Sequence, residues 1–147
     1  MLRTVRYQGA IVRDDHVLLI KHTNHDDGRS YWLVPGGGIE IDESEEACVM
    51  REMQEETNLM VSVERLILDE PAESGSIYQR RKTYLCRIVA GEPSPGYEPE
   101  EEASSVYGIT DVRWFDLRDH TTWDTLALND AITFPILRSI QAVLGYR

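Results

Sequence analysis

The 147-residue sequence predicts an α+β protein in which a mixed β-sheet lies between helices. Short apolar runs rich in β-branched and aromatic residues recur along the chain, as strands require. Two longer segments carry apolar residues at helical spacing. Strands and helices do not alternate regularly, so a purely parallel sheet is not expected. Because the chain shows no repeat or linker, we expect one domain, residues 1–147, with its own core.

In the first part of the chain three strands are expected, over residues 4–12, 17–20 and 31–34. Asp14 and Asp15 are typical residues for the turn between the first two strands. The polar stretch 22–30 is expected to be a loop. Pro35-Gly36-Gly37-Gly38 should end the third strand.

A helix is expected over residues 44–57. Asp42 and Glu45 have the spacing of an N-cap residue and its reciprocal carboxylate. Further strands are expected over residues 61–68, 77–89 and 111–117, the second long enough to bend or bulge. The stretch 92–105, with three prolines and a run of acids, reads as a loop. A C-terminal helix over residues 129–144 should be kinked or divided by Pro135.

The net charge of −11 limits the partners of the chain. Such an acidic protein repels duplex nucleic acid and anionic membrane, so an anionic substrate would need a neutralising cation. No apolar run approaches the roughly 18–20 residues of a membrane span, and the N-terminus lacks a signal-peptide pattern. Cys48 and Cys86 have no metal-ligand spacing, so we expect reduced thiols in a cytoplasmic protein.

The expected helix over residues 44–57 carries three acidic residues that share one face. Glu52, Glu55 and Glu56 stand at positions i, i+3 and i+4. Like charges this close destabilise a helix and raise one another's pKa, so a positive charge should compensate them. Arg51, four residues before Glu55, supplies part of that charge, and a hard cation such as Mg²⁺ would supply the rest. The alternative is a solvated acidic face without chemistry.

The spacing around these acids resembles the Nudix box, G-x5-E-x7-R-E-U-x-E-E-x-G-U, where U is a bulky aliphatic residue. The stretch Gly37 to Leu59 meets eight of the nine specified positions, namely Gly37, Glu43, Arg51, Glu52, Met53, Glu55, Glu56 and Leu59. Asn58 stands where the family has glycine. Since asparagine is the next best residue in the left-handed conformation, we expect an intact site. The resemblance implies the Nudix fold, an α/β/α sandwich.

The resemblance also implies roles for the residues of the box. Glu55 and Glu56 would bind a divalent metal, Mg²⁺ or Mn²⁺, and Glu52 would be a further ligand or a base acting on water. The Gly36 carbonyl would join them as a donor. Glu43 and Arg51 would fix the helix against the glycine loop.

The activity implied is that of a metal-dependent pyrophosphohydrolase, which cleaves a diphosphate linkage in a nucleoside triphosphate or another small nucleotide-like diphosphate. Two alternatives stay open: a catalytically weak Nudix module that senses a nucleotide, and a glycosyl hydrolase acting on a nucleotide sugar. No further signature identifies the substrate. A homodimer is compatible with the sequence, which has no feature that decides the oligomeric state.

The general base is a second open question. Many Nudix proteins carry an acid six residues before the tryptophan of the late strand, and Gly108 occupies that position here. The base is therefore either Glu52 or one acid of the cluster Glu98, Glu100, Glu101 and Glu102.

Other polar and aromatic residues are weaker candidates. The basic cluster Arg80-Arg81-Lys82 either meets substrate phosphates or lies on an exposed edge strand, with Arg81 facing away from its neighbours. Surface positions are expected for Lys21 and His22. Core or interface positions are expected for the strand tyrosines, and no base-stacking residue is assigned among Tyr7, Tyr31 and Tyr78.

Overall fold

The computed structural model describes residues 4–97 and 107–147. Within them seven strands form one sheet: β1 Val5–Arg13, β2 His16–Asn24, β3 Ser30–Leu33, β4 Gly36–Gly37, β5 Met60–Pro71, β6 Arg80–Ala90 and β7 Tyr107–Asp116. The order is β3-β2-β1-β6-β5, with β4 paired to β1 and β7 paired to β2. Strands β1 and β6 run parallel, and the other pairs are antiparallel. The expected mixed sheet is confirmed.

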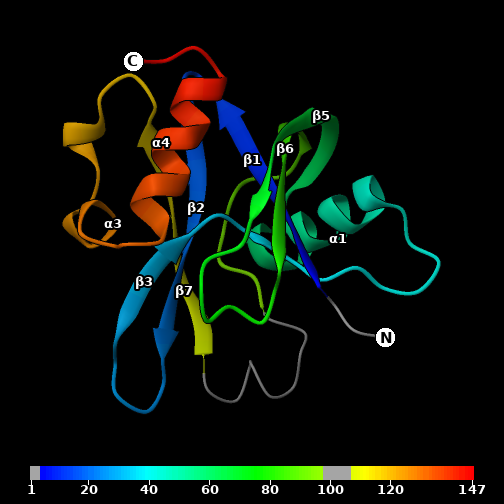
Figure 1. Ribbon diagram of the computed structural model, residues 1–147, viewed down its shortest axis with the longest axis horizontal. Coiled ribbons are helices and arrows are strands. Elements are labelled where there is room, and N and C mark those ends of the chain that lie inside the picture. Colours follow the sequence, from blue (N-terminus) through cyan, green and yellow to red (C-terminus); the bar gives the residue numbers. More distant parts are fainter. Residues whose placement is uncertain (1–3, 98–106) are drawn as a thin grey trace.

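Helices cover both faces of this sheet (Figure 1). Helix α1, Glu45–Thr57, packs on one face over a core that includes Tyr7, Ile11, Leu18, Val49, Met53 and Tyr84. The 3₁₀ helix η1 (His120–Thr122), α3 (Thr125–Leu128) and α4 (Thr133–Val143) follow β7 in the chain. Residues of α3 and α4 join a second core with Ala10, Leu19, Trp32 and Phe115. The α/β/α sandwich is confirmed. No helix in the described part of the chain is long and apolar enough to cross a membrane.

The start of α1 differs from the prediction. Ser44, not Asp42, is the N-cap: its hydroxyl accepts a hydrogen bond from the Ala47 N–H at 3.1 Å. Asp42 has a positive φ of 63° and forms part of the preceding turn. Glu45 binds Lys82 Nζ at 3.2 Å and the Tyr84 hydroxyl instead of closing a capping box. Both residues are good caps, so local pattern could not choose between them.

The end of α1 agrees with the prediction. Asn58 has φ 60° and ψ 25°, the left-handed conformation, and its N–H donates to Gln54 O at 3.1 Å. This is the usual geometry of a residue that follows the last helical turn.

The other bounds show where local pattern was insufficient. Strand β2 continues through residues 22–24, which were expected in a loop, because β3 and β7 pair with it there. Strand β6 begins only at Arg80. The C-terminal region contains η1 and α3 before α4, and Pro135 does not divide α4. Pro135 is the third residue of α4, where a missing N–H breaks no intrahelical bond.

The basic cluster lies on β6, between β1 and β5, so the expectation of an edge strand is wrong. Each of its cations has a carboxylate partner. Arg80 pairs with Asp69 at 2.8 Å, Arg81 pairs with Glu70 and Glu73, and Lys82 pairs with Glu45. These pairs neutralise the cluster, and alternation along β6 separates Arg81 from its neighbours.

Candidate active site

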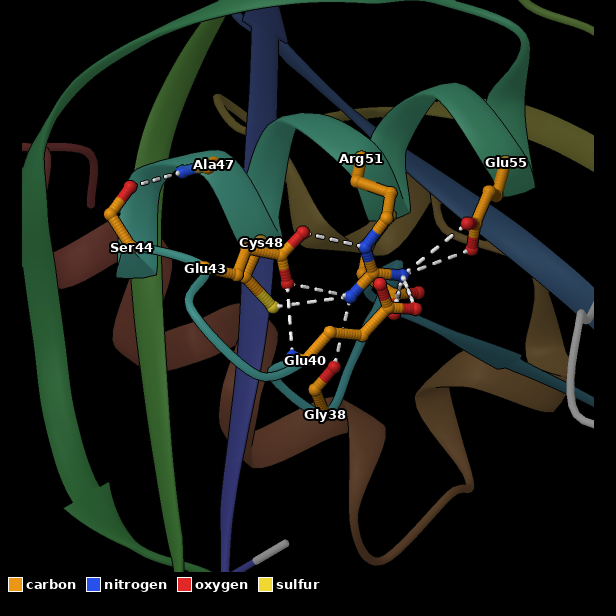
Figure 2. A network of polar contacts seen from close by, with 9 residues as sticks. Gly38, Glu40, Glu43, Ser44, Ala47, Cys48, Arg51 and Glu55 are labelled. Carbon is orange, nitrogen blue, oxygen red and sulfur yellow. Dashed lines mark hydrogen bonds and ion pairs between the residues drawn. The ribbon is translucent and has the colours of Figure 1, made fainter.

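Arg51 connects α1 to the loop that precedes it (Figure 2). Its Nε donates to Glu43 Oε2 at 2.8 Å, and its Nη2 donates to Gly38 O at 3.0 Å. Its Nη1 lies 2.9 Å from Glu52 Oε1 and 3.3 Å from Glu55 Oε2. The hydrogen bond from Arg51 lowers the pKa of Glu43, and the bond to Glu43 in turn raises the pKa of Arg51. One guanidinium thus holds carboxylates of both helix and loop.

Glu52 is fully buried, and its carboxylate lies directly on the glycine strand β4. A Cβ atom at Gly37 would stand 2.5 Å from Glu52 Oε1 and 2.7 Å from its carboxyl carbon. Only glycine allows this approach. A side chain at Gly37 would therefore displace the Glu52 carboxylate from β4.

Glu56 is held by the same strand. Its side chain is 1% exposed, and Oε1 accepts a hydrogen bond from the Gly36 N–H at 2.7 Å. Gly36 and Gly37 are in turn fixed by pairing with Gln8 and Tyr7 on β1. The acids of α1 are thus positioned by the sheet as well as by the helix.

The donor set of this cluster fits a hard divalent cation. Magnesium takes carboxylate oxygens together with waters and substrate oxygens, and Glu52, Glu55 and Glu56 supply carboxylates on one helix face. Arg51 Nη1 lies between Glu52 and Glu55 and supplies part of the positive charge that these carboxylates attract. In the arrangement of residues 4–97 and 107–147, no three His, Cys, Asp or Glu side chains are set to hold a metal ion. The residues therefore fit a divalent cation by the chemistry of their carboxylate oxygens.

A cavity of about 530 Å³ takes lining residues from β1, β3, β6 and α4 and from the segments before β6 and α4. Gln8, one of its lining residues, pairs on β1 with Gly36 of β4, whose N–H binds Glu56. The other lining residues are Arg6, Tyr31, Leu33, Val34, Glu73, Ser76, Ile77, Tyr78, Arg81, Asp130, Ile132, Thr133 and Ile136. A cavity of this size and mixed lining suits a small organic ligand.

His22 is one residue that the sequence analysis placed wrongly. It is buried, 8% exposed, and its ring lies against Tyr31 with centroids 5.6 Å apart. Burial and the nearby charge of Arg6 lower the pKa of His22 to about 4. The imidazole is therefore neutral at pH 7 and supports Tyr31 at the wall of the cavity.

Gly108 occupies the position, six residues before Trp114, at which many Nudix proteins carry an acid. Gly108 pairs with Thr23 on β2, and a Cβ atom there would stand 2.7 Å from His25 Cε1. The acidic residues Glu98, Glu100, Glu101 and Glu102 lie outside the described residues.

We predict that Arg51→Met destabilises the protein by about 3–5 kcal/mol, because it leaves the buried Glu52 carboxylate without its cation. Denaturant unfolding in chelator measures the loss, and added Mg²⁺ should recover part of it if a metal can take the place of the guanidinium. Arg80→Met is the matched control: Arg80 and Asp69 are 45% and 40% exposed, and such a pair contributes about 1 kcal/mol or less. An equal loss of unfolding free energy in the two variants would show that the contacts of Arg51 with Glu43, Glu52 and Glu55 contribute no more than an exposed ion pair.

Comparison with known proteins agrees with this arrangement. A profile of the NUDIX domain matches residues 3–135. The MutT-like protein of Streptomyces ambofaciens is 41% identical over 111 residues, 74% of this chain and 65% of that protein. The NAD-capped RNA hydrolase NudC of Vibrio vulnificus (strain CMCP6) is 30% identical over 106 residues, 72% of this chain and 36% of that protein. An ADP-ribose pyrophosphatase structure from Streptococcus suis 89-1591 has a TM-score of 0.66 at 22% identity, covering 97% and 92% of the two chains.

This chain has a carboxylate-bearing helix seated on a glycine strand of a mixed sheet, and the comparisons show its class to be that of the Nudix hydrolases. With the domain profile matched over residues 3–135, the chain belongs to the Nudix family. It spans about a third of the length of the first curated relatives that it matches, which are NudC proteins covered over 36%, 34% and 35%.

Proposed function

We propose that this chain hydrolyses a diphosphate linkage in a small nucleotide-like substrate, with Mg²⁺ or Mn²⁺ bound by Glu52, Glu55 and Glu56. The observation that carries the proposal is the seating of buried carboxylates on β4, with Glu52 on Gly37 and Glu56 on the Gly36 N–H. Burying acids is unfavourable unless they are compensated, so their presence on one face points to cation binding. The Gly36 carbonyl is a further candidate ligand.

Each residue of the cluster has a distinct proposed task. A bound divalent cation would neutralise the diphosphate and lower the pKa of a bound water. Arg51 and Glu43 hold α1 at a fixed distance from the loop around Gly38. Glu52 accepts the proton of the attacking water, unless an acid of residues 98–102 does so. Such a reaction depends chiefly on positioning and charge stabilisation.

The cavity that Gln8 helps to line would hold the organic part of the substrate. Its lining combines Arg6 and Arg81 with Glu73 and Asp130, so its formal charges balance. Its tyrosines, Tyr31 and Tyr78, offer flat apolar surface. An uncharged nucleoside or ribose group is therefore the favoured occupant, with the diphosphate directed toward Glu56.

A cytoplasmic location is part of the proposal. Cys48 and Cys86 are both free and buried, and burial raises the pKa of each thiol to about 12. Protonated, enclosed thiols are inert structural groups, which suits a reducing compartment.

We predict that hydrolysis requires a divalent metal and stops in excess chelator, while the circular dichroism spectrum stays native. The fold does not depend on metal, because α1 is anchored by its apolar core and by Arg51. A panel of nucleoside triphosphates, ADP-ribose and NAD with Mg²⁺ or Mn²⁺, read by ³¹P NMR of the products, would identify the substrate. Turnover that persists in chelator would exclude the metal mechanism.

The same panel separates the two alternative functions. The absence of an acid at Gly108 is the observation that keeps the sensor alternative, in which the chain binds a nucleotide without cleaving it. Calorimetric binding without new phosphorus signals would support a sensor. Release of free sugar with the diphosphate intact would instead show glycosyl hydrolysis.

A further inference from the structure

The segment 94–97 lies across the C-terminal end of α1 and bonds to its backbone. The last carbonyl groups of a helix have no intrahelical partner and must find one elsewhere. Here three are satisfied by N–H groups of this one segment: Ser94 to Thr57 O at 3.0 Å, Gly96 to Glu56 O at 3.0 Å and Tyr97 to Glu55 O at 2.8 Å. The backbone carbonyls of Glu55 and Glu56, two of the proposed metal ligands, therefore accept hydrogen bonds from a segment distant in sequence.

The approach of this segment is closer than an ordinary residue would allow. A Cβ atom at Gly96 would overlap the carbonyl oxygen of Glu55. A side chain at that position would push the segment away from α1. The contact is therefore a defined feature of the fold.

Asn58 adds a side-chain link between the same two parts. Its Nδ2 lies 2.9 Å from Ser94 Oγ, 3.3 Å from Ser94 O and 3.2 Å from Pro95 O. Glycine, the family residue at this position, could adopt the same left-handed backbone but has no amide to donate. The departure of this chain from the Nudix box thus supplies hydrogen bonds that the family residue cannot make.

From these contacts we infer that Asn58 is a positioning residue, which clamps segment 94–97 onto α1 and so fixes the direction of the Glu55 and Glu56 carboxylates. The clamp holds the backbone of the two glutamates from one side, while Arg51 and the Gly36 N–H hold their side chains from the other. Asn58 is exposed, so water competes for its hydrogen bonds. Its loss should therefore loosen the segment locally without unfolding the protein.

Replacing Asn58 by glycine tests the clamp, because Asn58→Gly keeps the left-handed backbone and removes the amide. Hydrogen exchange of the Ser94, Gly96 and Tyr97 amides in metal-free protein should become about 3–10-fold faster, as expected for the loss of one or two exposed hydrogen bonds. Calorimetry should show Mn²⁺ binding weakened about 3–10-fold. In assays, the metal concentration for half activity should rise by the same factor, while substrate KM and kcat at saturating metal stay within about twofold.

Two further variants sharpen the result. Asn129→Gly makes the same substitution at the exposed residue that follows α3, so it reproduces the added freedom of glycine in the unfolded chain and should change neither metal binding nor the three amides. Ser94→Ala removes the 2.9 Å acceptor and should give a smaller effect in the same direction. In the double variant, Ser94→Ala should add nothing to Asn58→Gly, because loss of the Asn58 amide has already removed the contact with the Ser94 hydroxyl.

The outcomes separate this inference from the proposed function, on which it rests. Unchanged exchange of the three amides in Asn58→Gly would overturn the clamp. Faster exchange with unchanged Mn²⁺ affinity would overturn the positioning of Glu55 and Glu56. An unmodified protein that binds Mn²⁺ but cleaves no diphosphate would count against the proposed function alone, since exchange and metal binding are measured without turnover.

Discussion

Glu56→Gln is expected to lower turnover by at least about 10²–10³-fold while the protein stays folded. The amide keeps the volume of the side chain, and its oxygen can still accept the Gly36 N–H that now binds Glu56 at 2.7 Å. What it loses is the negative charge that attracts a divalent cation, and removing one preorganised electrostatic contact costs a factor of this size. Steady-state rates at low and high Mg²⁺, with the thermal midpoint of each variant, check the prediction.

Glu55→Gln should behave similarly, and Glu46→Gln is the matched control. Glu46 is an exposed acid in the first turn of the same helix. Glu46→Gln therefore removes one negative charge from α1, but at a position that does not contact β4. Relief of like-charge repulsion can raise the thermal midpoint of the Glu55 and Glu56 variants in metal-free buffer. Full activity of both variants at low Mg²⁺ would show that the ligands are assigned to the wrong residues.

The parts of the site that sequence could predict are those fixed within one helix. Glu52, Glu55 and Glu56 share a face because of helical periodicity alone, and Arg51 reaches Glu55 at i+4 for the same reason. The left-handed conformation of Asn58 also followed from local preference. Local prediction also failed at the start of α1, because Asp42 and Ser44 are comparable N-cap residues. Asp42 adopts a positive φ in the preceding turn, and Ser44 is the N-cap.

The remaining features depend on contacts between distant segments. The Gly36 N–H reaches Glu56 only because β4 pairs with β1, and a two-residue strand has no periodicity to detect. His22 is buried because β3 and β7 extend β2 beyond its apolar residues. The cavity takes residues from β1, β3, the turn before β6 and α4. Segment 94–97, with the sequence Ser-Pro-Gly-Tyr, has no strand or helix periodicity, so nothing in its pattern indicates that it binds the end of α1.

Glu52→Gln tests the identity of the base. General-base catalysis contributes about 10²–10⁴-fold in rate, so we expect turnover to fall by at least that factor if Glu52 takes the proton of the attacking water. Glu52 is fully buried on Gly37 and bonded to Arg51, which fixes its orientation. Neutralising Glu98, Glu100, Glu101 and Glu102 one at a time should cost little. Rates at saturating metal, together with Mn²⁺ affinity, separate loss of a base from loss of a ligand.

The opposite result would move the base to the acidic stretch. Tyr97, the last described residue before this stretch, donates its N–H to Glu55 O at 2.8 Å. A single variant among its four acids that matched the Glu52→Gln loss, with Mn²⁺ affinity unchanged, would identify that acid as the base. Glu52 would then be a metal ligand only. Its contacts with Gly37 and Arg51 would serve to place the metal, since both fix the carboxylate whichever group accepts the proton.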